Sequence, residues 1–160
     1  MRMINNSQII IRPARIDEIG ELQRLNQEAF VDNVKYDPDL VMDWAMSDKG
    51  REHFTKIFGS PDSQCFVADD TGVLVGYIVL SERFIDYRKS RCVEINDVGV
   101  TPAYQSKGIG SLLIQKAVEW AKEKGYQKMY VSCYFKNTRA ISFYRKNGMA
   151  EIDLGLERDL

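Results

Sequence analysis

The chain has 160 residues, the size of one domain. Hydrophobic residues make up 44% and charged residues 28% of it. These shares are ordinary for a soluble globular protein and exclude disorder, collagen and coiled coil as descriptions of the whole chain. A net charge of −1 leaves no strongly basic field that would hold nucleic acid or an anionic membrane.

The first half of the chain is expected to alternate helices with strands. Apolar residues recur at helical spacing after Asp17, and β-branched runs end at turn-forming residues. The expected elements are a strand over Ile9–Arg12, a helix over Asp17–Phe30, one or two short helices around Leu40–Met46 and Arg51–Phe58, and strands over Gln64–Ala68 and Val73–Leu80. A hairpin turn at Asp69–Gly72 joins the last two strands.

The second half predicts a strand–helix–strand unit. Its expected elements are a strand over Cys92–Val100, a helix over Gly108–Lys124, a strand over Lys128–Tyr134, a helix over Thr138–Lys146 and a last strand over Ile152–Leu156. This order predicts an α/β (α+β) fold in one domain over residues 1–160. We expect a single mixed, largely antiparallel sheet with a central βαβ unit and helices on both faces.

Charge is unevenly spread along the chain, and cysteine usage suggests a reducing compartment. Residues 1–80 carry 8 basic and 13 acidic side chains, whereas residues 81–160 carry 14 and 10. The three cysteines form no CxxC pair, and the first apolar run is too short for a signal peptide. No stretch is long enough to span a membrane. We expect free thiols, a cytoplasmic location and, with one histidine, no histidine-rich metal site.

The segment that carries chemistry lies where the strand over Cys92–Val100 gives way to the next helix. Gln105, Gly108 and Gly110 form a Gln-x-x-Gly-x-Gly pattern there. Two missing Cβ atoms let backbone N–H groups approach an anion at a helix end that carries a partial positive charge. A phosphate site is one interpretation, and close packing of helix on sheet is the other. The spacing fits neither a Walker loop nor a complete dinucleotide fingerprint.

This pattern resembles the acetyl-CoA-binding motif of the GNAT superfamily of N-acetyltransferases, Q/R-x-x-G-x-G/A. The segment Asn137–Met149, with its Asn, Ala, Phe-Tyr and Gly, resembles the second motif of that family. The opening Ile11–Ala14 followed by Asp17 is similar to the family's first strand and helix. Met149 departs from the pattern, because an aromatic residue is more usual there. The resemblance covers nearly the whole chain and is densest over residues 93–149.

The resemblance implies direct transfer of an acetyl group from acetyl-CoA to a primary amine of a small molecule or peptide. It also implies which residues bind the co-substrate through backbone and side-chain groups: Val98, Val100, Gln105, Ser106, Lys107, Gly108, Ile109, Gly110, Ser111 and Asn137. Nearby basic residues, Lys136, Arg139 and Arg145 among them, suit its phosphates or form an ordinary solvated face. No metal is implied.

Three residues are candidates for proton transfer. The resemblance makes Tyr144 the acid that protonates the departing thiolate, with an ordinary half-buried tyrosine as the alternative. The base is Glu94 or Asp97, directly or through water, and Glu94 is favoured by its match to some family members. Glu94 and Asp97 are three residues apart, and residues at this spacing face opposite sides of a regular strand. Their side chains can therefore face one site only if a bulge lies between them.

The acceptor pocket is expected within residues 30–60 and the loop over residues 83–91. Four aspartates give the first region a charge that would attract a cationic amine or merely aid solubility: Asp32, Asp37, Asp39 and Asp43. Tyr36 and Trp44 are candidates to line the pocket, with a place in the core as the alternative for Trp44. We expect His53 on a helix surface, without a catalytic role, and Cys133 on a buried strand.

Two further interpretations stay open. A GNAT-like domain that binds acyl-CoA as a sensor would not need Tyr144 or an acidic residue. A mononucleotide-binding α/β regulator would need a Walker lysine or a complete GxGxxG, and both are missing. The oligomeric state also stays open, with a homodimer as one outcome, because the family that the chain resembles is often dimeric through its C-terminal strands.

Overall fold

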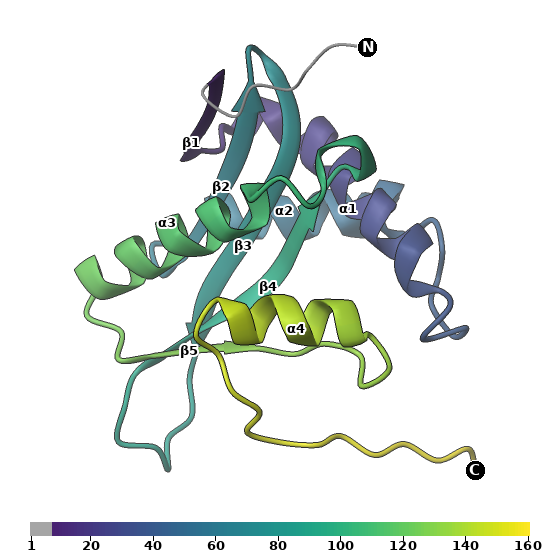
Figure 1. Ribbon diagram of the computed structural model, residues 1–160, viewed down its shortest axis with the longest axis vertical. Helices are drawn as coiled ribbons and strands as arrows, with labels where there is room; N and C mark the ends of the chain where they lie inside the picture. The colour runs from purple at the N-terminus through teal and green to yellow at the C-terminus, as the bar shows by residue number, and fades with distance from the viewer. Residues whose placement is uncertain (1–7) are drawn as a thin grey trace.

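A five-stranded sheet forms the middle layer of the protein in a computed structural model, which describes residues 8–160 (Figure 1). The strands are β1 (Ile9–Pro13), β2 (Ser63–Asp70), β3 (Val73–Arg83), β4 (Cys92–Val100) and β5 (Lys128–Val131). They lie in the order β1-β2-β3-β4-β5. The first three pairs are antiparallel and β4 pairs with β5 in parallel. The expected mixed, largely antiparallel sheet is confirmed.

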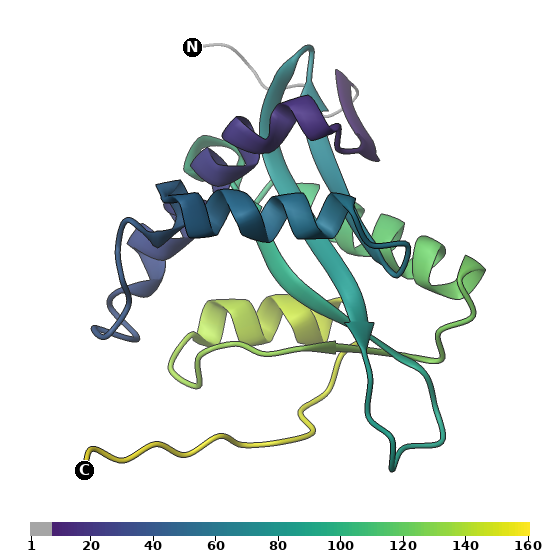
Figure 2. The same cartoon turned by 180° about the vertical axis from the view of Figure 1, so that it is seen from behind.

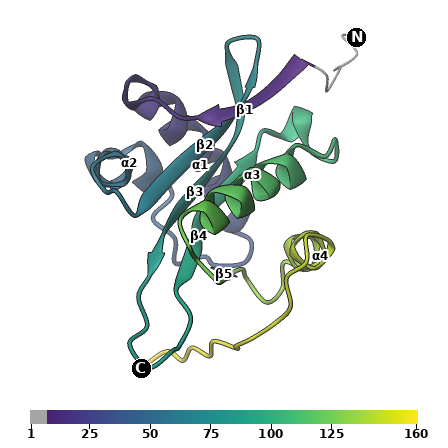
Figure 3. The same ribbon diagram turned by 90° about the vertical axis from the view of Figure 1, so that its left-hand side faces the viewer.

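Helices cover both faces of the sheet. Four are α-helices: α1 (Ile19–Asn33), α2 (Asp48–Phe58), α3 (Ile109–Glu123) and α4 (Thr138–Lys146). Three single 3-10 turns are η2 (Ile16–Glu18), η3 (Trp44–Met46) and η4 (Pro102–Tyr104). In Figure 1, α3 and α4 lie in front of the sheet, and Figure 2 shows α1 and α2 on the other face. Figure 3 shows the resulting layers from the side.

Each face of the sheet has its own hydrophobic core. Leu113 and Ala117 of α3 are fully buried against Ile78, Leu80 and Val93 of the sheet. On the other face, Leu22 of α1 and Phe54 of α2 pack with Val67, Tyr77 and Val79. The apolar stripes expected for these helices therefore face the sheet. Among residues 8–160, no helix is long and apolar enough to cross a membrane.

The structure differs from the expected elements in three places. Only the 3-10 turn η3 forms within Leu40–Met46. β5 ends at Val131, three residues earlier than expected, because its partner β4 turns away from it there. The strand expected over Ile152–Leu156 is wrong: residues 149–160 have no regular structure, and the alternating side chains Ile152, Leu154 and Leu156 are exposed.

Candidate functional site

The two parallel strands part halfway along β4. Pairing with β5 runs only from Cys92 to Ile95, opposite Lys128 to Val131. Beyond that point, β4 continues to Val100 while paired with β3 alone. The edge of β4 from residue 96 onward is therefore open toward the segment that follows β5.

Hydrogen-bond alternation decides which backbone groups face this opening. The Thr101 N–H donates to the Val75 carbonyl at 2.9 Å, so Thr101 faces β3. In an antiparallel pair, successive residues face the partner strand in alternation. Val100 and Val98 therefore direct their N–H and C=O groups away from β3, into the opening. The Gln105 side chain uses one of these groups, donating from Nε2 to the Val100 carbonyl oxygen at 2.8 Å.

A bulge in β4 decides where its acidic side chains point. Val79 is paired with Asp97 and Leu80 with Ile95, so Asn96 is an extra residue in β4. The bulge turns Asp97 to the same face of the sheet as Glu94, which lies opposite Ser81. Without it, Asp97 would point into the core under α3.

A cavity of about 1060 Å³ occupies the opening. Residues 95–100 of β4 form one wall, and residues 131–134, at the end of β5 and beyond it, form another. Parts of α1, the loop before α3, the first residues of α3, and α4 complete the lining. Because α1 lies on the opposite face of the sheet from α3 and α4, the cavity is lined from both faces (Figure 3).

The two ends of the cavity carry opposite charge. Its charged lining residues on the α4 side are Arg139 and Lys146. Its carboxylates, Glu28, Asp32 and Asp97, come from α1 and β4. Such a division draws an anionic group to one end and a cationic group to the other.

The α3 end has the geometry of an anion cradle. Gly108, the residue before α3, has φ +84°, and an added Cβ would meet no atom within 4 Å. No side chain caps the first turn, so the first N–H groups of α3 stay available beside the cavity. The side chains of Gln105, Ser106 and Ser111 also line this end. Arg139 donates to the Ser106 hydroxyl at 3.4 Å and ties the cradle to α4.

Helix α4 forms the cavity wall on the α3 side of the sheet, beside the point where β4 and β5 separate. It starts as expected, with the Asn137 side chain accepting from the Ala140 N–H at 3.0 Å. A Cβ on Gly110 would lie 3.0 Å from two atoms of the Phe143 ring. The close approach of α4 to α3 therefore depends on the missing side chain at Gly110. Tyr144 lines the cavity, and burial raises the pKa of its hydroxyl. Within the described part of the chain, that hydroxyl has no hydrogen-bond partner.

Asp97 is the centre of a polar cluster that the sequence did not predict. Its Oδ2 lies 2.8 Å from His53 Nε2, and its Oδ1 accepts from Asn26 Nδ2 at 3.2 Å. The same amide nitrogen donates to the Tyr77 hydroxyl at 2.8 Å. His53 is thus half-buried against a carboxylate, and the expectation of a plain helix-surface histidine is wrong. Nothing local marks this contact, since 44 residues separate the two partners.

Most of the residues expected to bind the co-substrate meet in this cavity. Lining residues among them are Val98, Val100, Gln105, Ser106, Gly108, Gly110, Ser111 and Asn137. Lys107 and Ile109 are not among them: Lys107 lies over the Tyr104 ring, and Ile109 is buried in the core. Of the proton-transfer candidates, Asp97 and Tyr144 line the cavity, whereas Glu94 does not.

The expected acceptor residues are only partly brought together. Asp32 lines the cavity, and Asp37 accepts from the lining residue Tyr134 at 3.1 Å. Tyr36 stacks on Tyr134 with ring centroids 5.8 Å apart. The loop over residues 83–91 contributes no lining residue. Cys133 is exposed and lines the cavity, so its expected burial in a strand is wrong.

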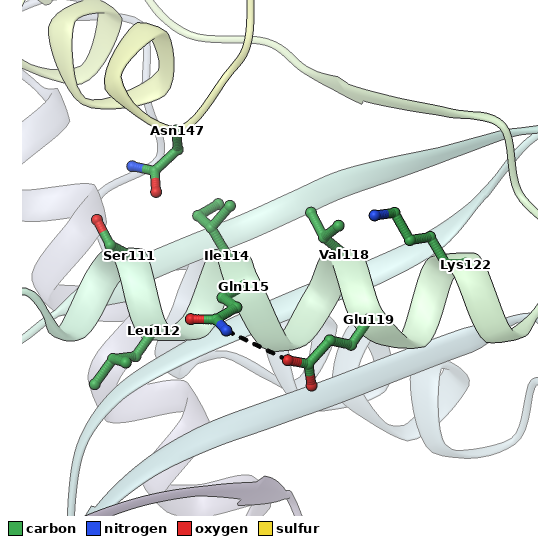
Figure 4. Close-up of a pocket in the computed structure, with 8 residues that line it drawn as sticks. All are labelled: Ser111, Leu112, Ile114, Gln115, Val118, Glu119, Lys122 and Asn147. Atoms are coloured by element: carbon green, nitrogen blue, oxygen red, sulfur yellow. Dashed lines mark hydrogen bonds between the residues drawn. The ribbon is translucent and has the colours of Figure 1, made fainter.

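A second hollow, of about 450 Å³, runs along α3 toward Asn147 (Figure 4). Its wall is mostly formed by side chains of α3, among them Gln115, which donates to Glu119 at 3.5 Å. It gathers no cluster of catalytic side chains. Over residues 8–160, no group of three or more His, Cys, Asp or Glu residues is placed to hold a metal.

The model of the acetyltransferase (GNAT) family matches residues 22–149. An uncharacterized N-acetyltransferase of Methanocaldococcus jannaschii is 30% identical over 102 residues, which are 63% of this chain and 45% of that protein. The thialysine N-epsilon-acetyltransferase of Bos taurus is 26% identical over 153 residues, 90% of this chain and 85% of that one. The chain thus spans less than half of the first relative and most of the second.

A solved structure of a variant of the BH1408 protein from Bacillus halodurans has the same fold. The TM-score is 0.83 at 22% sequence identity, and the match covers 94% of this chain and 99% of that one.

Proposed function

Because the chain belongs to the acetyltransferase (GNAT) family, we propose that it transfers an acetyl group from acetyl-CoA to a primary amine of a cationic acceptor. One observation carries the proposal: a single cavity runs through the split between β4 and β5, with an anion cradle at one end and carboxylates at the other. Acetyl-CoA supplies the acetyl group as an activated thioester.

The α3 end fits the pyrophosphate of this co-substrate. The first N–H groups of α3 and the open space at Gly108 suit phosphate oxygens, which also favour the positive end of a helix dipole. Gln105, Ser106 and Ser111 add hydrogen-bond donors, and Arg139 and Lys146 add positive charge. Lys107 and Ile109 contribute through the backbone of the same turn.

The open edge of β4 fits the pantetheine arm and the thioester. Backbone groups of Val100 face the opening and pair with the amides of an extended arm, as in the addition of a strand to a sheet edge. The Val98 N–H, which faces the same way, donates to the thioester carbonyl oxygen. This contact strengthens as negative charge develops on that oxygen. Asn137 lies within reach of the arm at the start of α4.

The carboxylates favour a cationic acceptor. Glu28 is already bound by Arg24 at 2.8 Å and by the Thr101 hydroxyl at 2.7 Å. Within residues 8–160, the one ion pair of Asp32 is an exposed contact with Lys35, which stabilises little. The paired aromatic rings of Tyr36 and Tyr134 stand at this end with Asp37. An acceptor with more than one amino group would use Asp32 for one charge while another amine is acetylated.

Asp97 is the base that best fits this geometry, and Tyr144 is the acid. Asp97 lies at the cavity wall beside Val98, whereas Glu94 lies outside it. Asp97 takes the proton of the attacking amine as nitrogen bonds to the thioester carbon and the carbon–sulfur bond breaks. The half-buried Tyr144 hydroxyl is protonated at neutral pH, as any tyrosine is, and burial raises its pKa further. It donates to the departing thiolate, a good leaving group that needs modest help.

The test is thiol release from acetyl-CoA across a panel of diaminoalkanes, aminoglycosides, amino acids and short peptides. The proposal predicts turnover with multiply charged amines and little with neutral or anionic acceptors. If no amine is acetylated, acetyl-CoA binding measured by calorimetry distinguishes the possible reasons. Binding without turnover on any amine supports the sensor interpretation, and no binding removes the proposed function altogether.

A further inference from the structure

Four elements each contribute one side chain to the hydrogen-bonded cluster at Asp97. Asn26 comes from α1, His53 from α2, Tyr77 from β3 and Asp97 from β4. Asp97 and Tyr77 line the cavity, whereas Asn26 and His53 stand behind them. The cluster therefore connects the cavity wall to the two helices on that face of the sheet.

Both oxygens of the Asp97 carboxylate are engaged. An ionised carboxylate only accepts hydrogen bonds, so a donor must face each oxygen. Asn26 Nδ2 serves Oδ1 with one hydrogen and the Tyr77 hydroxyl with the other. His53 must present Nε2–H to Oδ2, which fixes its tautomer when the ring is neutral. Two donors from two helices thus hold one carboxylate in one orientation.

The packing around His53 holds the ring in place. It lies 5.9 Å from the Trp44 ring and 5.1 Å from the Phe54 ring, edge-on to the latter. Gln23 fastens η3 beneath it by donating to the Ala45 and Ser47 carbonyls at 3.0 and 3.2 Å. The His53 side chain keeps 28% exposure, but within residues 8–160 its one ion-pair partner is Asp97.

Two other titratable groups near Asp97, the Tyr77 hydroxyl and the Cys65 thiol, stay neutral. Tyr77 is fully buried, and burial together with the charge of Asp97 raises its pKa well above the ordinary value. The same two causes raise the pKa of the Cys65 thiol on β2. Asp97 is therefore the negative charge that the imidazole meets, and neither neighbour competes with it.

We propose that His53 and Asn26 are positioning residues that hold the Asp97 carboxylate at the cavity wall in the orientation that receives the proton of the acceptor amine. This inference rests on the proposed function, in which Asp97 is the base. Neither residue touches the reacting atoms, and both act through Asp97. Misplacing a reacting group by about 1 Å costs on the order of 100-fold in rate, so loss of one of two clamps should be visible in turnover.

The experiment compares His53→Ala with His53→Gln, alone and in an Asp97→Asn background. Glutamine keeps an N–H donor at about the reach of Nε2, whereas alanine removes it. We expect His53→Ala to lower kcat about 10- to 100-fold and to leave the acetyl-CoA Kd within twofold. His53→Gln should recover most of the loss. Glu52→Gln, which changes an exposed neighbour on α2 paired with Lys56, is the matched control and should leave kcat unchanged.

A double-mutant cycle distinguishes positioning from general support of α2. If His53 acts through Asp97, His53→Ala should cost less than about twofold when Asp97 is already asparagine. Multiplicative effects in the cycle would overturn the inference. So would a His53→Gln variant as slow as His53→Ala, or a loss of acetyl-CoA affinity equal to the loss of kcat.

A second measurement is independent of turnover, so that failure of the proposed function would not hide the answer. His53 is the only histidine of the chain, so in untagged protein its ring resonances need no assignment. We expect Asp97→Ala to shift the ring nitrogen and proton resonances of His53, and Glu119→Gln, on the opposite face of the sheet, to leave them unchanged. A His53 spectrum indifferent to Asp97→Ala would overturn the inference even in an inactive protein.

Discussion

Replacing Asp97 by asparagine separates the two candidate bases and has an expected size. Asp97 is the lining carboxylate held by an asparagine amide and an imidazole rather than by an arginine or lysine, so its charge is available to the acceptor. For an amine of ordinary pKa 10.4, the protonated form exceeds the neutral form by about 2,500-fold at pH 7. Forming the neutral amine, which is the form that attacks, therefore costs about 4.6 kcal/mol. General base catalysis raises the rate by about 100- to 10,000-fold and so offsets much of this cost.

We therefore expect Asp97→Asn to lower kcat/KM for a diaminoalkane by about 100- to 10,000-fold at pH 7. The acetyl-CoA Kd should stay within about twofold, because asparagine keeps the size of the side chain. The defect should also shrink as pH rises, by about tenfold per unit, since solution then supplies the free amine. The assay is thiol release between pH 7 and 10, after subtraction of the uncatalysed reaction.

Glu94→Gln is the matched comparison on the same strand and the same face. The structure places Glu94 outside the cavity, so its loss should change kcat/KM by less than about threefold. An Asp97→Asn defect of less than threefold at pH 7, or a defect that persists unchanged to pH 10, would show that Asp97 is not the base. A larger defect in Glu94→Gln would transfer the base to that residue.

Three further changes test the rest of the site and the core. Tyr144→Phe should lower kcat about tenfold and leave acetyl-CoA affinity within a few-fold in calorimetry, and unchanged turnover would remove the hydroxyl from the reaction. Gly108→Glu should abolish acetyl-CoA binding in a folded protein. Its control is Gly72→Glu, which has the same left-handed strain of about 1–2 kcal/mol in the β2–β3 turn, and equal affinity of the two variants would place the phosphates elsewhere. Leu113→Ala, at a fully buried position, should cost about 3–5 kcal/mol in urea unfolding, and Leu112→Ala, at a position 38% exposed, less than about 1 kcal/mol.

The fold could be predicted wherever local signals suffice. The α4 boundaries follow from the Asn137 cap and from Gly148, whose φ is +85°. The turn before α3 follows from the Gln105 to Gly110 spacing, because the left-handed φ of Gly108 favours glycine and the close contact of Gly110 with Phe143 leaves no room for a Cβ. These features are properties of a few neighbouring residues and are visible in the sequence.

The rest depends on partners that are distant in sequence. The bulge at Asn96 is a register shift against β3, and it alone moves Asp97 to the face of Glu94. The contact between His53 and Asp97 joins α2 to β4, and no periodicity signals it. The exposed Cys133 and the missing strand at Ile152–Leu156 have one cause: alternating apolar residues favour a strand, but a strand needs a neighbouring edge.

The most direct test of the proposed function is a crystal structure with CoA bound. We expect the pyrophosphate on the backbone of residues 105–111, the pantetheine arm along the open edge of Val98 and Val100, and the thiol near Tyr144. CoA lying instead in the hollow along α3 (Figure 4), or leaving the split between β4 and β5 empty, would contradict it.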